Sequence, residues 1–116
     1  MSTDFPTRID YVEFTSPEMD KSKAFFAQAF GWEYIDYGPD YQDIQKAGLG
    51  GGIERGDLRA PLIVLYADDL DAALARVKEA GAEITKDVFS FPGGKRFEFQ
   101  EPGGNLMAVW TKLDAQ

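Results

Sequence analysis

The stretch RIDYVEFTSPEMDKSKAFFAQAFG, residues 8–31, decides the first part of the fold. In Arg8–Thr15, Val12 and Phe14 fall on one face, while Tyr11 and Glu13 fall on the other. Because successive side chains of a strand point to opposite faces, this alternation predicts a β-strand. One face of that strand is expected to pack on the helix that follows, and the other face to point away from the helix.

The second part of the stretch predicts a helix. Ser16 can cap free amide groups, Pro17 suits a first turn and Gly31 can end the helix. Residues that recur at helical spacing predict a buried stripe, made of Ser22, Phe25, Phe26, Ala29 and Phe30.

Outward from this stretch, the same order of elements occurs twice. Short strands are predicted at 32–38, 41–47 and 50–55, then a buried strand at 61–67 and a helix at 68–81 capped by Asp68. Three more strands are predicted at 82–91, 94–101 and 105–112. Gly31 and Gly81, which end the two helices, lie about 50 residues apart, as in a duplicated unit.

This order predicts an α+β fold of two βαβββ modules that form curved mixed sheets. We expect one domain over residues 1–116, with module one at about 8–56 and module two at about 60–113. The glycines at 48–52 precede no Lys-Ser/Thr pair and no helix, so they predict close backbone packing in a sheet rather than a phosphate loop.

Composition excludes several classes of function. The net charge of −8 opposes nucleic-acid binding, and the longest apolar runs are too short to span a membrane. The chain has no histidine and no cysteine, which removes the usual imidazole base, the thiolate nucleophile and the commonest zinc ligands. With no signal-peptide pattern at the N-terminus, a cytoplasmic protein is expected.

Three segments together resemble the glyoxalase/bleomycin-resistance/extradiol-dioxygenase superfamily, also called the vicinal oxygen chelate (VOC) superfamily. They are IDYVEFTSPEMDKSKAFFAQAFGWEY, LIVLYADDLDAALARVKEAGAEI and FEFQEPGGNLMAVW, and the likeness runs from about Arg8 to Lys112. The resemblance implies paired βαβββ modules, each a partial barrel around a cleft. It also implies a homodimer, which is common among small members.

The resemblance further implies which positions would hold a metal in metal-dependent relatives. Those positions carry Tyr11, Leu62 and Ala108, with a fourth near Gly51–Ile53, where Glu54 is the nearby carboxylate. Leucine and alanine cannot ligate a metal. We therefore expect no metal site and no cofactor, although a carboxylate-only site for a hard cation stays open in principle.

The candidate ligand-binding residues are those expected to face the cleft, namely Tyr11, Glu13, Tyr34, Leu62, Tyr66, Ala108 and Trp110. Glu13 is also the catalytic candidate, as an acid or base. The alternative is structural: Glu13 would pair with Lys95 or Arg96, and the aromatic residues, Phe97 and Phe99 among them, would belong to the core. The DDLD run at Asp68–Asp71 is expected to cap a helix rather than to bind a metal.

Two classes of function remain. The first is a metal-independent protein that binds a small, cationic or aromatic molecule in its cleft, as drug-sequestering relatives of the bleomycin-resistance kind do. The alternative is a metal-independent lyase or isomerase that uses Glu13, or an interaction module whose cleft is filled by its own aromatic side chains.

Overall fold

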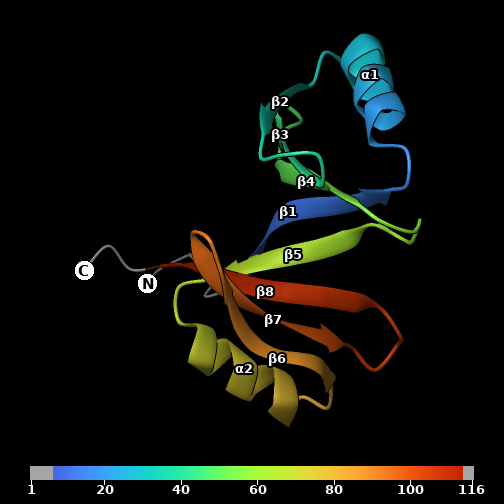
Figure 1. The fold of residues 1–116 in the computed structure, drawn as a ribbon. Helices are drawn as coiled ribbons and strands as arrows, with labels where there is room; N and C mark the ends of the chain where they lie inside the picture. Colours follow the sequence, from blue (N-terminus) through green and yellow to red (C-terminus); the bar gives the residue numbers. More distant parts are fainter. Residues whose placement is uncertain (1–6, 114–116) are drawn as a thin grey trace. The chain divides into compact units, whose positions relative to one another are not determined.

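The computed structural model describes residues 7–113 (Figure 1). These residues form two compact units, one at 10–62 and one made of 7–9 with 63–113. The first contains most of β1 (Thr7–Ser16), then α1 (Met19–Phe30), β2 (Glu33–Asp36), β3 (Tyr41–Gln45) and β4 (Gly50–Arg55). The second contains β5 (Leu62–Ala67), α2 (Leu70–Glu79), β6 (Glu83–Phe91), β7 (Gly94–Gln100) and β8 (Leu106–Lys112). The predicted α+β fold and its repeated order are confirmed.

In the first unit the strand order is β2-β3-β4-β1. β1 runs parallel to β4, whereas β3 pairs antiparallel with both β4 and β2. The register sets Glu13 opposite Gly52, and Gly52 opposite Asp43. These three residues form a row across the centre of the sheet.

The second unit repeats this arrangement with the order β5-β8-β7-β6. β5 runs parallel to β8, and β7 pairs antiparallel with β8 and β6. Here the central row is Val64, Ala108 and Glu98. Val64 thus occupies the position that Glu13 has in the first unit, and Ala108 the position of Gly52.

Each unit has an apolar core between its helix and its sheet. In the first, Met19, Ile44 and Ile53 are buried, and Phe14 and Phe26 pack against them. In the second, the core between α2 and the sheet is built from the buried residues Ala67, Leu70, Ala73, Phe97, Phe99 and Val109. Phe97 and Phe99 are therefore core residues, as the structural alternative predicted.

The predicted buried stripe of α1 is wrong for three of its residues. Phe25 and Phe30 are each 59% exposed, and Ala29 is exposed as well. The exposed rings stack on the edge of the core instead: Phe30 lies 5.5 Å from Trp32, measured between ring centroids. The helix buries only a narrow face, through Met19 and Phe26, because a short four-stranded sheet covers little of its circumference.

The helix ends differ slightly from prediction. The Oγ of Ser16 accepts the amide of Glu18 at 3.0 Å, so Ser16 stabilises the turn before α1 rather than capping the helix itself. Asp69, not Asp68, caps α2 by accepting the amide of Ala72 at 3.0 Å. Gly31 adopts the left-handed conformation predicted for the residue that ends α1. Among residues 7–113 no helix has the length and apolar character needed to cross a membrane.

Candidate functional site

The face of the first sheet that points away from α1 carries a group of polar side chains. On β1, Phe14 faces the helix and packs on Phe26 with ring centroids 5.6 Å apart. Tyr11 and Glu13 therefore point to the other face, as the alternation predicts. Tyr41 and Asp43 of β3 lie on this same face, because Ile44 belongs to the core on the helix side.

Gly52 makes room for two tyrosines at the centre of this face. A Cβ atom at Gly52 would lie 2.0 Å from the hydroxyl of Tyr41 and 2.3 Å from the hydroxyl of Tyr11. The ring of Tyr11 also covers Gly50, where a Cβ atom would meet its Cδ2 at 3.0 Å. The glycines on β4 therefore serve close packing, as predicted, and tyrosine rings or hydroxyls approach two of them, Gly50 and Gly52.

The two tyrosines connect two carboxylates. The hydroxyl of Tyr41 donates to Oε2 of Glu13 at 3.2 Å, and the hydroxyl of Tyr11 donates to Oδ1 of Asp43 at 3.3 Å. The two hydroxyl groups are also hydrogen-bonded to each other. Each hydroxyl has one hydrogen, so two hydrogens are shared among three oxygen–oxygen contacts. The four side chains therefore form one hydrogen-bonded network.

Arg59 supplies the positive charge of this network. Its Nη2 lies 3.5 Å from Oε1 of Glu13 and 3.7 Å from Oε1 of Glu54. The side chain of Glu13 is 7% exposed, whereas that of Arg59 is 40% exposed. Arg96, one of the two partners that the sequence-based alternative gave to Glu13, pairs with Glu98 at 2.7 Å. The pairing of Glu13 with Lys95 or Arg96 stays a prediction.

Burial keeps both tyrosines protonated. Burial raises the pKa of Tyr41 well above the usual tyrosine value near 10, and its hydrogen bond to Tyr11 and the charge of Glu13 add to the effect. Burial also raises the pKa of Tyr11. The hydrogen bond to Tyr41 acts in the opposite direction, and the charge of Asp43 raises the pKa further. At neutral pH both groups are therefore hydrogen-bond donors and not phenolate bases.

The corresponding face of the second unit carries the ion pair of Arg96 with Glu98 and a group of aromatic side chains. Tyr66 and Trp110 meet edge to face with centroids 5.0 Å apart, and Phe91 lies 6.2 Å from Trp110. The guanidinium of Arg8 lies 4.9 Å from the centroid of Tyr66. Ala108 is 0% exposed, and Leu62 at the start of β5 is also buried.

The predicted site residues are distributed over both units. Tyr11 lies with Glu13, and Tyr66 lies with Trp110. Tyr34 belongs to neither group, because it packs on the core beside α1 and donates to the carbonyl of Lys23 at 3.1 Å. Sequence reasoning missed Tyr41, Asp43, Gly52 and Arg59 as members of the site. Alternation about Ile44 is the signal that would have placed Tyr41 and Asp43 beside Tyr11.

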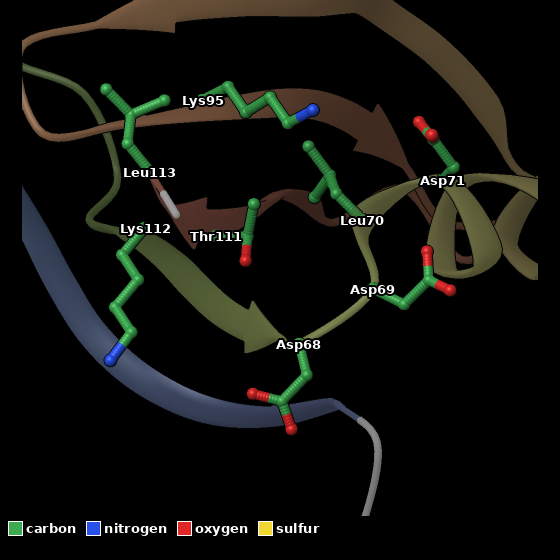
Figure 2. Close-up of a pocket in the computed structure, with 8 residues that line it drawn as sticks. All are labelled: Asp68, Asp69, Leu70, Asp71, Lys95, Thr111, Lys112 and Leu113. Carbon is green, nitrogen blue, oxygen red and sulfur yellow. The ribbon is translucent and has the colours of Figure 1, made fainter. Parts of the chain in front are cut away.

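A hollow of about 520 Å³ lies elsewhere in the second unit (Figure 2). Figure 2 shows three aspartates at the beginning of α2 together with lysines from β7 and β8. The residues that line the hollow are Asp68, Asp69, Leu70, Asp71, Lys95, Thr111, Lys112 and Leu113. Asp69 acts as the helix cap, and Thr111 donates to the hydroxyl of Tyr66 at 3.5 Å. The predicted capping role of this acidic run is confirmed, with Asp69 as the residue that fills it.

The residues at the positions that would hold a metal do not fit one. Tyr11 has a phenol that stays protonated, and Gly52 has no side chain. The side chains of Leu62 and Ala108 are hydrocarbon and cannot ligate a metal. Over residues 7–113, no three of the Asp, Glu, His and Cys side chains gather closely enough to hold a metal ion. Divalent ions need several oxygen, nitrogen or sulfur ligands, and these four positions do not supply them.

Comparison with known proteins gives one family. A model of the Glyoxalase/Bleomycin resistance protein/Dioxygenase superfamily matches residues 8–109. A search of curated proteins found no matching sequence. Among solved structures, a Mn(II)-bound glyoxalase from Novosphingobium aromaticivorans is 28% identical with a TM-score of 0.72, over 94% of this chain and 42% of that one. The present chain thus spans less than half the length of that glyoxalase.

Two further structures share the fold at lower identity. Methylmalonyl-CoA epimerase from Mycobacterium tuberculosis is 14% identical with a TM-score of 0.75, over 98% of this chain and 93% of that one. A superfamily member from Vibrio splendidus is 22% identical with a TM-score of 0.64, over 91% of this chain and 99% of that one. At these identities the likeness concerns the fold alone.

Proposed function

The chain belongs to the glyoxalase/bleomycin resistance protein/dioxygenase superfamily, and from this premise we propose that it binds a small organic molecule without a metal ion. The ligand contacts the first unit, on the face that carries Tyr11, Glu13 and Tyr41. It is a cationic or aromatic molecule, recognised by hydrogen bonds and ring contacts rather than by coordination to a metal.

One observation carries this proposal: the hydroxyls of Tyr11 and Tyr41 meet in the space where a side chain at position 52 would begin. Metal-dependent relatives are expected to use that part of the sheet for a ligand. In this chain the same space holds two neutral phenol groups that donate hydrogen bonds. Such groups suit an organic ligand and give little affinity for a divalent ion.

The charge around the tyrosines favours a cationic ligand. The carboxylates of Glu13 and Asp43 accept hydrogen bonds from the phenol groups, and Arg59 lies between Glu13 and Glu54. The rings of Tyr11 and Tyr41 also offer faces to which a cation is attracted. The net charge of −8 acts in the same direction at longer range.

The proposal is tested by titrating the isotope-labelled protein with three isosteric probes: benzamidine, benzamide and benzoate. We expect saturable shifts in the NMR signals of Tyr11, Glu13 and Gly52, larger for benzamidine than for the neutral or anionic probe. Gly52→Ala should abolish them, because its methyl group displaces both hydroxyls. Tyr37→Phe, at an exposed residue outside the network, is the matched control and should leave them unchanged. Saturable shifts confined to the second unit, or none with any probe, would refute the proposal.

The geometry favours binding over acid–base catalysis by Glu13. Oε2 of Glu13 accepts from Tyr41 and its Oε1 faces Arg59, so both carboxylate oxygens already contact the protein's own side chains. A substrate of a lyase or isomerase would have to approach this carboxylate beside those contacts. Metal-independent turnover that Glu13→Gln eliminates is the result that would favour this alternative.

We further propose that the protein is a homodimer, as expected for small members of the superfamily. The support is the aromatic surface of α1, where Phe25 and Phe30 are largely exposed, since large exposed apolar side chains that gather together are typical of association surfaces. Sedimentation equilibrium should give twice the mass of the chain. Phe30→Asp should shift the equilibrium to the monomer, and a monomeric wild-type protein would contradict this proposal.

A further inference from the structure

The network of phenols and carboxylates in the first unit has a carboxylate at each end. In the register of the sheet, Glu13 and Asp43 stand on either side of Gly52, and the hydroxyls of two tyrosines occupy the space above that glycine. A cationic group forms its strongest hydrogen bonds with an ionised carboxylate. The two ends of the network are therefore the candidates for the acceptor of a cationic ligand.

Glu13 is the less accessible of the two carboxylates. Its side chain is 7% exposed. Its Oε2 accepts from the hydroxyl of Tyr41 at 3.2 Å, and its Oε1 lies 3.5 Å from Nη2 of Arg59. A ligand would have to share both oxygens with these groups, so the Glu13 end of the network is already engaged within the chain.

Asp43 has one oxygen that is firmly held and one that is not. Nε2 of Gln45 donates to Oδ2, which fixes the direction of the carboxylate. The other oxygen, Oδ1, accepts from the hydroxyl of Tyr11 at 3.3 Å, a length beyond the usual range of O–H···O hydrogen bonds. A carboxylate oxygen can accept two hydrogen bonds, and Asp43 is only half-buried. Its Oδ1 can therefore accept from a molecule that approaches this face.

The hydroxyl hydrogen of Tyr11 has a second acceptor besides Asp43. It can also go to the hydroxyl of Tyr41, with which Tyr11 is hydrogen-bonded. Tyr41 in turn donates to Glu13, so in this arrangement both hydroxyl hydrogens stay in hydrogen bonds. The network can therefore give up its contact with Asp43 without the cost of an unpaired hydroxyl.

We propose that Asp43 determines the specificity of the ligand face by accepting a hydrogen bond from the cationic group of the ligand. An amidinium, guanidinium or ammonium N–H binds at Oδ1 of Asp43, and the hydroxyl of Tyr11 turns its hydrogen to Tyr41. The Oδ2 atom stays on Gln45 throughout. This inference rests on the proposed function, because it assigns the acceptor for the same ligand.

The direct test replaces the acceptor by a donor. In Asp43→Asn the amide oxygen stays on Gln45, so the NH2 group takes the place of Oδ1. Benzamidine should bind about tenfold or more weakly than to wild type, since a charge-assisted hydrogen bond is lost, and its advantage over benzoate should disappear. The matched control is Asp40→Asn, which removes the same charge from a side chain that is 81% exposed in a turn. That variant should lose less than about twofold in affinity, because exposed charges are well screened.

A measurement on the wild-type protein decides the question if Asp43→Asn does not fold. The carboxyl carbons of the aspartates and glutamates are isotope-labelled and followed by NMR. Benzamidine should shift the Cγ signal of Asp43 in a saturable manner, and the Cγ signal of Asp40 should not respond. Benzoate should leave the Asp43 signal in place.

The possible outcomes separate this inference from the proposed function. Equal losses of benzamidine affinity in Asp43→Asn and Asp40→Asn would overturn the assignment and leave the proposed function standing. A benzamidine response centred on the Cδ signals of Glu13 or Glu54 would do the same. No saturable binding of benzamidine to wild type would reject both. A loss confined to Asp43→Asn, with the advantage over benzoate gone, upholds Asp43 as the acceptor.

Discussion

The two units share strand order and register, yet the faces of their sheets away from the helices differ in the pair of residues at their centre. In the first, Glu13 stands opposite Gly52 and takes part in a network of phenols and carboxylates. In the second, the equivalent pair is Val64 and Ala108, and both side chains are buried and hydrocarbon. The helix-facing sides do not differ in this way, since both are apolar cores.

The difference shows which part of the repeat the fold requires. The helix can stay on its sheet only by burying apolar area, so the core side keeps its character in both units. The other face is under no such requirement, and its chemistry is free to serve a ligand in one unit and packing in the other. We therefore expect ligand binding at this face of the first unit, and a contribution to the stability of the fold from this face of the second.

The largest difference in stability between the two units is expected when their central residues, Glu13 and Val64, are exchanged. Val64→Glu places a carboxylate in a buried apolar setting and should lower the free energy of unfolding by about 4 kcal/mol or more. Glu13→Val should cost less, about 1–2 kcal/mol, because Arg59 can return to solvent while the hydroxyl of Tyr41 loses its acceptor. Urea denaturation followed by circular dichroism measures both.

The outcome that contradicts this prediction is a similar loss in both variants. It would mean that the second face is as tolerant of charge as the first. Val64→Ile is the control for a change of volume at the same position without a change of polarity.

The second prediction concerns the pair of small residues. Gly52→Ala should cost about 1–3 kcal/mol, because its methyl group forces two tyrosine rings from their positions. Ala108→Gly, at the equivalent position, should cost only about 0.5–1 kcal/mol through backbone entropy. Equal costs from the same denaturation experiment would show that the space above Gly52 is not specifically reserved for the hydroxyls.

The third prediction uses alkaline pH. Burial raises the pKa of Tyr11 and of Tyr41 in the folded state above the unfolded value near 10. Their contribution to stability is thus fully present below pH 10 and decreases as the pH rises beyond it, since the unfolded chain then loses protons that the folded chain keeps. The slope is at most about 1.4 kcal/mol per pH unit for each tyrosine, and partial exposure of both side chains reduces it.

Comparison with a variant isolates this contribution. The double variant Tyr11→Phe/Tyr41→Phe should lose stability less steeply than wild type between pH 10 and the onset of alkaline unfolding. Parallel curves for the two proteins would show that the pair titrates like exposed tyrosine.

The smallest effect is expected at Arg8, on the aromatic face of the second unit. Arg8→Ala removes a cation from the face of Tyr66 at an exposed position, for a loss of about 0.5–1 kcal/mol in the free energy of unfolding. Benzamidine binding should not change. A loss of probe binding in this variant would move the ligand site to the second unit.

The sequence predicted the fold better than the site. Strand alternation and helix punctuation are local signals, so the repeated βαβββ order and the side on which Val109, Leu65 and Ala67 meet α2 could be predicted. The exposure of Phe25 and Phe30 could not, because it depends on how much of α1 a short sheet covers. Tyr41 and Arg59 reach Glu13 through strand register and a connector path, which are not local properties of the sequence.

The central claim, a ligand face that needs no metal, is tested most directly with Mn(II), the ion of the glyoxalase relative. The chelator-treated protein is titrated with Mn(II) while paramagnetic broadening of its amide NMR signals is followed. We predict only weak, non-saturating broadening at exposed acidic residues, with the signals of Tyr11, Gly52 and Ala108 unaffected. Saturable broadening centred on those three residues at one equivalent of Mn(II) would contradict the account.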